Sequence, residues 1–409
     1  MFVGLHRHSH YSKRDAIAKI PDMVSRIGEL QQNAWALTDH GTTSGLMEAY
    51  KETKKYNKEH NTSIKFIFGM EGYWIPNYYI KDRKESCHII LLAKNETGYH
   101  NLLRLATIGY GDKGNKPDNF FYTMRLTTED IIAHKEGLIV SSACMGGFLN
   151  PRNGDEWDYD LAYDRAKTFQ NAFGEDFYVE VQCATDDRQK EYNQNMIDLA
   201  TDLGLSAYVT EDSHYVNKDE ADTHRKWLGI GEDSDYYQTD DYYIHSEQQV
   251  RNSLSYLDDT IVNELIEETE RVASKCEQVE IPFGEKHYPV FEVPKGETPL
   301  SQMCKLVADG FKKKVVGHVP ESEYPKYKAQ IDHEIKVLDK IDYTNYMLMT
   351  EDFVRGCHNL GIRTGIGRGS VGGCLVAYLM DITRIDPIKY GLIFERFAHD
   401  KRSSSADKH

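Results

Sequence analysis

The chain has 409 residues, more than a single compact core usually holds, so we expect two domains or one large barrel with an appendage. Its 40% apolar residues exclude a disordered chain, and its net charge of −16 argues against non-specific nucleic-acid binding over the whole surface. It has no membrane-length apolar run, no signal peptide at the amino terminus and no Cys-x-x-Cys pair, so a reduced cytoplasmic protein away from the membrane is expected.

The first 215 residues alternate strand-like apolar runs with helix-like segments. Such alternation predicts a parallel sheet with helices between the strands, and the number of strands favours a barrel over an open sheet. Strands are expected at 3–5, 34–38, 64–68, 89–93, 137–141, 177–182 and 205–209, and helices at 20–31, 43–60, 99–108, 159–173 and 188–203.

The remainder of the chain shows fewer clear patterns. The acidic, tyrosine-rich stretch at 232–243 is typical of a solvated loop. Turn-forming residues near 281–296 indicate a boundary, so we expect a first domain over 1–285 and a second over 286–409. Helices are expected at 298–316 and 324–338, and glycines become frequent between 361 and 373.

Residues that can bind metal ions follow most of the strands expected in the first domain. In a parallel α/β barrel, functional groups lie beyond the carboxyl ends of the strands. A mixture of imidazole, thiolate and carboxylate groups suits Zn²⁺, Fe²⁺, Mn²⁺ or Mg²⁺, and predicts two or three ions that hydrolyse a phosphoester. The candidates are His6, His8, Asp15, His40, Glu71, His88, Cys144, Asp212 and His214, of which only His88 precedes its strand.

Each of these positions also has an ordinary structural explanation. A lone His-x-His is more often structural than a ligand, Cys144 could be a small buried apolar residue, and Asp39 could cap a helix. The joint pattern rarely arises by chance, which favours the metal site. His10 would point away if His6 and His8 share one face, so it is left out.

Several segments resemble motifs of the PHP (polymerase and histidinol phosphatase) domain. They are HRHSHYS at 6–12, LTDHG at 37–41, GMEGY at 69–73 and DSHY at 212–215. More specifically, the chain resembles the amino-terminal part of the bacterial C-family replicative DNA polymerases, the polymerase III alpha subunits. LLAKNETGY at 91–99 is a further match.

The likeness continues into the second domain. TGIGRGSVGGCLVAY at 364–378 looks like the glycine-rich palm motif of this family, and DPIKYGLIFERF at 386–397 looks like the segment that follows it. The resemblance implies a distorted (β/α)7 PHP barrel, followed by an incomplete α+β palm region. It also implies up to three metal ions on the nine candidate residues, with Asp39, Asp212 and His214 in catalysis.

The glycine-rich segment has a physical logic of its own. Glycines let backbone N–H groups approach a triphosphate closely, and hydroxyl and guanidinium groups bind phosphate oxygens. A tight turn before a helix starting near residue 370 is the alternative. By resemblance, the incoming dNTP would be held by Gly367, Arg368, Gly369, Ser370 and Arg396.

The resemblance to this family is incomplete at the carboxyl terminus. The family holds two Mg²⁺ ions with an Asp-x-Asp pair; Asp407 matches the first aspartate, and His409 stands at the second. We therefore expect this polypeptide alone not to polymerise DNA. It could be half of a split polymerase completed by a second polypeptide, a fragment, or a protein that kept only the nuclease.

Three functions follow from these observations. The first is the PHP–palm portion of a replicative DNA polymerase, working with primer–template DNA and dNTPs. The second is a stand-alone metal-dependent phosphoesterase or 3′–5′ exonuclease acting on single-stranded 3′ ends. The third is a non-catalytic scaffold stabilised by its metal ions.

Overall fold

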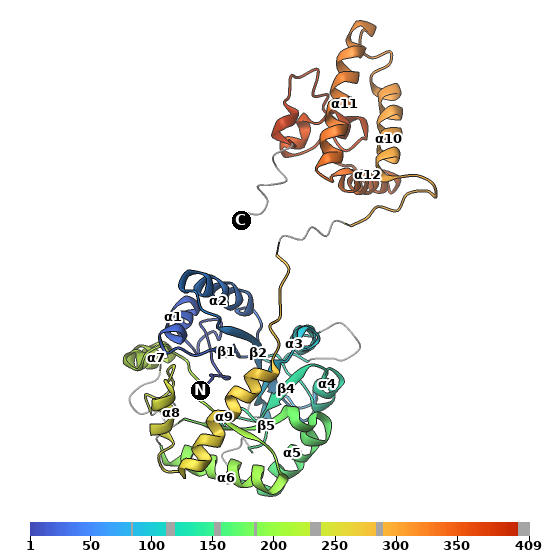
Figure 1. Cartoon of the computed structure of the whole chain (residues 1–409). Coiled ribbons are helices and arrows are strands. Elements are labelled where there is room, and N and C mark those ends of the chain that lie inside the picture. Colours follow the sequence, from blue (N-terminus) through green and yellow to red (C-terminus); the bar gives the residue numbers. More distant parts are fainter. Residues whose placement is uncertain are drawn as a thin grey trace. The chain divides into compact units, whose positions relative to one another are not determined.

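The computed structural model describes residues 1–82, 85–111, 119–150, 157–183, 186–229, 239–283 and 289–399 (Figure 1). The chain divides into two compact units, Met1–Glu280 (unit 1) and Ile281–His409 (unit 2). The boundary predicted after residue 285 falls outside the described residues. Within the described ranges, none of the helices has the length and apolar character needed to span a membrane.

Unit 1 is built on a six-stranded sheet in which the strands are neighbours in sequence order. β3 is antiparallel to both β2 and β4, and the remaining pairs are parallel. The prediction of an entirely parallel sheet is therefore wrong at β3, since the described residues between β2 and β3 contain no α-helix that could carry a parallel crossover. The strands are β1 Ala34–Leu37, β2 Lys65–Trp74, β3 Cys87–Ala93, β4 Leu138–Ser141, β5 Phe177–Gln182 and β6 Ala207–Thr210.

The amino-terminal segment joins the two edges of this sheet. Gly4 forms a parallel bridge with Trp35 in β1, and Arg7 forms a parallel bridge with Ser213, just after β6. The strand predicted at 3–5 is therefore seen as isolated bridges instead of a regular strand. It nevertheless occupies a seventh strand position and closes the sheet into a distorted α/β barrel.

Helices surround the sheet of unit 1 (Figure 1). α6 shows the expected amphipathic pattern, because Tyr192, Met196 and Leu199 on one face are buried. Asp186 caps this helix by accepting a hydrogen bond from the amide of Gln189. The helices are α1 Ile20–Glu29, α2 Leu46–His60, α3 Glu96–Gly109, α4 Thr128–Ala133, α5 Tyr159–Phe173, α6 Asp187–Leu203, α7 Ala221–Leu228, α8 Glu247–Ser253 and α9 Asp259–Lys275.

Apolar side chains fill the barrel at one end. Leu5, Ala36, Ile67 and Tyr208, from the amino-terminal segment and three strands, belong to a buried cluster that also includes Val272 of α9. α9 thus covers the end of the barrel where the parallel strands begin. The polar groups that follow these strands are left at the opposite rim.

Among the described residues of unit 2, the regular secondary structure consists of helices and short 3₁₀ turns joined by irregular segments (Figure 1). Its helices pack around a core that includes Met303, Val307, Leu338, Leu348 and Leu375. The β part of the expected α+β region is therefore not found among the described residues. The helices are α10 Pro299–Lys314, α11 Tyr324–Lys340, α12 Thr344–Asn359 and the short α13 Leu375–Leu379; the glycine-rich Gly369–Gly373 forms a 3₁₀ turn.

Candidate metal centre

The structure brings all nine predicted ligand side chains together at the open rim of the barrel. Five of them are almost fully buried and four are partly exposed. They come from the amino-terminal segment (His6, His8, Asp15), the end of β1 (His40), β2 and β3 (Glu71, His88), the loop after β4 (Cys144) and the segment after β6 (Asp212, His214).

The carboxylate of Glu71 lies at the middle of this cluster. Its Oε1 is 3.1 Å from Nδ1 of His88 and 3.4 Å from Nε2 of His6. Its Oε2 is 2.5 Å from Nδ1 of His40 and 3.4 Å from Nε2 of His8. Each carboxylate oxygen therefore faces its own pair of imidazoles, which is the arrangement expected of a carboxylate that bridges two ions.

Two further groups extend the cluster on either side of Glu71. Oδ1 of Asp212 lies 3.2 Å from Nε2 of His6 and 3.1 Å from Nε2 of His8. Sγ of Cys144 lies 3.2 Å from Nδ1 of His88. Asp212, His6 and His8 thus form one set of neighbouring donor atoms, and Cys144 and His88 form another.

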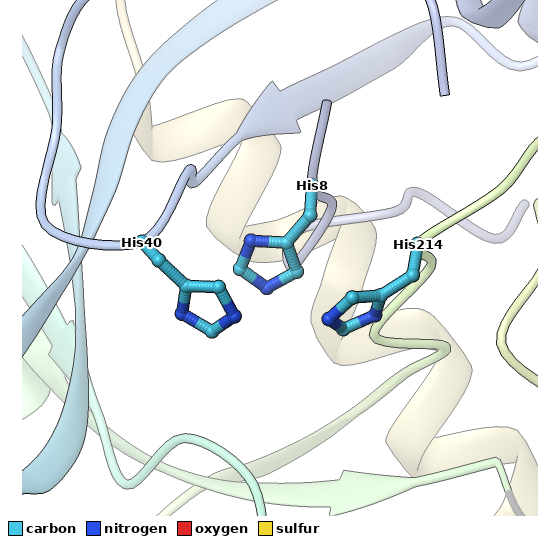
Figure 2. Close-up of side chains that lie close together, drawn as sticks. All are labelled: His8, His40 and His214. Carbon is cyan, nitrogen blue, oxygen red and sulfur yellow. The ribbon is translucent and has the colours of Figure 1, made fainter. Parts of the chain in front are cut away.

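A third group of donors faces the same space. Oδ2 of Asp15 lies 2.6 Å from Nε2 of His40 and 3.6 Å from Nε2 of His214. Figure 2 shows the imidazoles of His8, His40 and His214 lying close together, although their segments are far apart in the sequence. The ring centroids of His8 and His40 are 4.1 Å apart, and those of His8 and His214 are 4.6 Å apart.

The donor atoms fit divalent cations. Among the described residues, both carboxylate oxygens of Glu71, both ring nitrogens of His40 and Oδ1 of Asp212 are buried without an aligned hydrogen bond, despite their close contacts. Buried polar atoms normally have partners, and a cation between them would supply one. Three sets of donors lie close enough to share an ion: His8, His40 and His214; His6, His8 and Glu71; and His40, Glu71 and His88.

The charges of the cluster favour the ligand forms of Glu71 and His8. Burial opposes ionisation of Glu71, but His88, His40 and His6 hold its pKa well below its ordinary value. Burial, together with His40 and His214, lowers the pKa of His8 to about 3. Glu71 is therefore a carboxylate and His8 a neutral imidazole near neutral pH, and these are the forms that bind metal ions. Burial opposes protonation of His6, His40 and His214, but the neighbouring carboxylates raise the pKa of each above its ordinary value, so an ion would displace protons there.

Asp39, predicted to be catalytic, occupies a different place. Its carboxylate accepts hydrogen bonds from the amide and hydroxyl of Ser9, at 2.7 and 2.8 Å, and from the hydroxyl of Ser12 at 2.7 Å. Oγ of Ser12 in turn lies 3.2 Å from Nδ1 of His8 and accepts a hydrogen bond from the amide of His40. The structure thus places Asp39 behind His8, where its carboxylate holds Ser12, and its predicted catalytic role stays a prediction.

Glu180 is a site residue that sequence reasoning missed. It is fully buried, and its Oε1 lies 2.6 Å from Nδ1 of His6 and accepts a hydrogen bond from Thr210. A carboxylate behind a histidine fixes the ring so that its other nitrogen faces the centre. A glutamate among the apolar residues of a buried strand, FYVEVQ at 177–182, was the available signal.

The glycine-rich loop of unit 2 is open to solvent at Arg368 and Ser370. Gly367 and Gly369 have φ angles of 115° and 74°, which glycine adopts without strain. A Cβ at Gly367 would lie 3.0 Å from the side chain of Thr383, so a larger residue would also crowd this neighbour. The loop therefore depends on glycine, while its binding of a nucleotide stays a prediction.

Arg396 ends a 3₁₀ turn, Phe394–Arg396, that lies against this loop. A Cβ at Gly373 would come within 2.4 Å of the carbonyl oxygen of Ile393, which shows how closely the two segments approach. Asp407, predicted to bind Mg²⁺, lies outside the described residues.

Comparison with known proteins matches both parts of the chain. The PHP domain family matches residues 4–184, and the bacterial DNA polymerase III alpha NTPase domain matches residues 301–408. DNA polymerase III subunit alpha of Borreliella burgdorferi is 34% identical, over 99% of this chain and 34% of the relative. The subunit of Helicobacter pylori (strain J99) is 30% identical, over 99% of this chain and 35% of the relative.

The chain is thus related over 99% of its length to bacterial DNA polymerase III alpha subunits, and it spans about a third of their length. Its first part matches the PHP domain, and its second part matches the NTPase domain of these subunits. Seven of the nine candidate ligands lie within the matched PHP region, and Asp212 and His214 lie beyond it. The glycine-rich loop and Arg396 lie within the second matched region.

Among solved structures, an amidohydrolase from Chromobacterium violaceum aligns with a TM-score of 0.35 and 18% identity, over 54% of this chain and 89% of that chain. This likeness is too slight to support a statement about function. The functional argument depends on the sequence relatives and on the geometry of the centre.

Proposed function

We propose that unit 1 is a metal-dependent phosphoesterase that holds two or three divalent ions with the nine rim residues. The observation that carries this proposal is Glu71, a buried carboxylate whose two oxygens face separate pairs of imidazoles. The mixture of nitrogen, oxygen and sulfur donors suits Zn²⁺, Mn²⁺ or Fe²⁺. The substrate that we favour is the 3′-terminal phosphodiester of a DNA strand, so that the site acts as a 3′–5′ exonuclease.

Ions held by these residues would lower the pKa of a bound water and offset the negative charge of a phosphoester. The chain itself fixes the geometry: Glu180 orients His6, and Asp39 acts through Ser12 on His8. Nδ1 of His214 lies 2.7 Å from the main-chain oxygen of Asp212, which leaves Nε2 facing the centre. We assign Asp212 and His214 to both binding and catalysis.

Metal analysis combined with a hydrolysis assay tests this proposal. The purified chain should contain two or three equivalents of metal and should shorten a single-stranded oligonucleotide in Mn²⁺ or Zn²⁺. Glu71→Gln should lose metal and most of the hydrolysis, since it removes the carboxylate charge at the middle of the donor cluster. Glu29→Gln, an exposed glutamate of α1, is the matched control. Bound metal without hydrolysis of any phosphoester would instead support the non-catalytic scaffold.

We further propose that the whole chain works as the PHP–palm portion of a replicative DNA polymerase. The relation to alpha subunits over 99% of the chain and the glycine-rich loop support this role. The chain spans about a third of the length of the curated relatives that it matches. DNA, dNTPs, Mg²⁺ and a polypeptide that supplies the remaining polymerase parts would then be its partners.

Primer extension tests the polymerase proposal. The chain should not extend a primer alone, and should do so after mixing with a polypeptide that corresponds to the remaining two thirds of the relatives. Arg368→Ala should weaken extension in the mixture, since it removes a cation from the exposed loop. No extension in the mixture would contradict the proposal.

A further inference from the structure

A pocket of about 640 Å³ opens on the surface of unit 1, and its lining includes residues that closely follow the predicted ligand His40 in the sequence. Its size is within the range of small-ligand sites. One wall begins two residues after His40 and carries three hydroxyl groups; the other wall belongs to α3 and the turn that follows it. The lining residues are Thr42, Thr43, Ser44, Leu103, Ala106, Thr107, Tyr110 and Gly111.

Two exposed aromatic rings lie at this pocket, and a third exposed ring is close to them in the sequence. Tyr110 lines it and is 55% exposed, and Phe120 is 47% exposed. The two rings stack with centroids 5.7 Å apart and an angle of 21° between their planes. Tyr122, two residues further on, is 67% exposed. Large apolar groups gathered on a surface mark a binding site more often than isolated ones do.

Met124 connects these rings to the metal centre. A Cβ at Gly41, next to His40, would lie 2.9 Å from Met124, and a Cβ at Gly109, next to Tyr110, would lie 2.6 Å from the same side chain. Met124 therefore packs between the loop that follows His40 and the end of α3. Tyr122, with a left-handed φ of 61°, is held two residues before this contact.

We propose that Tyr110, Phe120 and Tyr122 form a base-stacking surface for the unpaired end of a DNA strand whose terminal phosphodiester enters the metal centre. The proposal rests on the proposed function of unit 1 and specifies its substrate class, which is single-stranded DNA. Aromatic faces stack on any base, so the surface would not select a sequence. The hydroxyls of Thr42 and Ser44 are placed to donate hydrogen bonds to the sugar–phosphate backbone.

The hydroxyl groups of Thr42, Thr43 and Ser44 distinguish this pocket from a purely apolar docking site. Oγ1 of Thr42 and Oγ of Ser44 lie 2.8 Å apart, on the side of the pocket nearest His40. Stacking rings and hydroxyl donors together suit a strand with bases on one side and its sugar–phosphate backbone on the other.

Binding of two oligonucleotides tests the proposal. The full-length, metal-loaded chain is titrated with a fluorescent octathymidylate protected by phosphorothioate linkages, and with an abasic octamer of equal charge. Tyr110→Ala and Phe120→Ala should each weaken octathymidylate binding roughly tenfold and leave abasic binding unchanged, because they remove stacking alone. Phe120→Tyr, which keeps the ring, should bind like wild type. Tyr159→Ala, an exposed tyrosine on α5, is the matched control.

Hydrolysis of bis(p-nitrophenyl) phosphate by wild type separates this proposal from the proposed function. If the ester is not cleaved but octathymidylate binding still depends on the rings, the phosphoesterase assignment fails and the stacking surface stands. If the ester is cleaved but both octamers bind equally, or the alanine variants bind like wild type, the stacking proposal is wrong. The exposed rings would then fit a protein partner.

Discussion

Three of the five histidines of the centre, His6, His8 and His214, are held by the ring nitrogen that faces away from the cluster. Nδ1 of His6 lies 2.6 Å from Glu180, Nδ1 of His8 lies 3.2 Å from Ser12, and Nδ1 of His214 lies 2.7 Å from a main-chain oxygen. In each case Nε2 is left to face the cluster. The rings are therefore oriented before an ion arrives, which reduces the conformational entropy lost on binding.

Glu180→Gln tests this orienting effect. The amide keeps the size of the side chain but removes the negative charge next to Nδ1 of His6, so we expect metal affinity to fall about 10- to 100-fold while the fold is retained. Zn²⁺ competition with a chromophoric chelator measures the affinity, and circular dichroism measures the fold. Glu175→Gln, at an exposed position just before β5, is the control. Equal Zn²⁺ affinity in Glu180→Gln and wild type would rule the effect out.

Arg7 lies between the predicted ligands His6 and His8 in the sequence, and its side chain anchors this segment through hydrogen bonds to other parts of unit 1. It is fully buried, and its Nε donates a hydrogen bond of 2.6 Å to Glu211. Its Nη2 donates a second hydrogen bond, of 2.8 Å, to Gln32. There is no room for a Cβ at Gly4, since it would lie 2.2 Å from the guanidinium group.

Glu211→Ala should destabilise unit 1 by roughly 3–5 kcal/mol, because it leaves the buried guanidinium of Arg7 without its carboxylate. Urea unfolding followed by tryptophan fluorescence measures this change. The double variant Arg7→Met with Glu211→Leu should cost less than Glu211→Ala, since it leaves no charge unpaired. A double variant that is the less stable of the two would contradict this account.

At the level of secondary structure, the sequence predicted the residues of the metal centre better than it predicted the direction of the strands. Helix and strand periodicity placed most elements of unit 1, and ligand-type residues after the strands converge as expected. His88 is predicted to precede its strand but lies in β3, and because β3 is antiparallel, its first residues lie at the same rim as the carboxyl ends of the other strands. The direction of a strand could not be predicted from periodicity.

The roles of Asp39 and Glu180 in the centre could not be predicted, because a carboxylate can bind a metal ion, orient a histidine or accept hydrogen bonds from the backbone. Asp39 lies beside a predicted ligand in the sequence, yet its carboxylate turns to Ser9 and Ser12. Glu180 sits inside a strand, where a glutamate offers no sign of the histidine that approaches from the amino terminus. Both roles depend on whether the side chain points into the barrel, and this direction is set by the three-dimensional fold.

In unit 2, a carboxylate of one helix caps another helix. Glu334 of α11 is fully buried and accepts hydrogen bonds from the amides of Leu375 and Val376, at 3.0 and 2.8 Å. These amides begin α13, directly after the glycine-rich turn Gly369–Gly373. Glu334 therefore ties the loop predicted to bind a nucleotide to the core of unit 2.

Burial raises the pKa of Glu334, although the hydrogen bonds from the amides act in the opposite direction. The contribution of such a group to stability is fully present below its unfolded pKa, roughly 4.3, and is lost as the pH rises through the folded pKa. Glu334→Gln does not titrate. The free energy of unfolding of Glu334→Gln, relative to wild type, should therefore increase between about pH 4 and pH 7.

Urea unfolding of the whole chain at several pH values measures this trend, with unit 2 followed as the part of the far-ultraviolet circular dichroism change that tryptophan fluorescence of unit 1 does not share. Glu321→Gln, at an exposed position before α11, is the control and should show no such change. A stability difference between Glu334→Gln and wild type that is constant or falls with rising pH would contradict the account.

At the level of the whole molecule, the two units carry different chemistry. All nine donors of the centre belong to unit 1, and the glycine-rich loop belongs to unit 2. All four tryptophans, Trp35, Trp74, Trp157 and Trp227, also belong to unit 1. Tryptophan fluorescence thus reports on unit 1 alone, while circular dichroism reports on both units.

Metal removal should therefore affect only one of the two units. Ions that bind folded unit 1 at 100 times their Kd add about 2.7 kcal/mol per site to its free energy of unfolding. For a domain of this size, each kcal/mol raises the unfolding temperature by roughly 2–4 °C. A chelator should thus lower the transition seen by tryptophan fluorescence by several degrees and leave the unit 2 transition, seen by circular dichroism, in place. Glu71→Gln should not respond to the chelator, and equal shifts in both units would show that the ions are not held by the barrel rim.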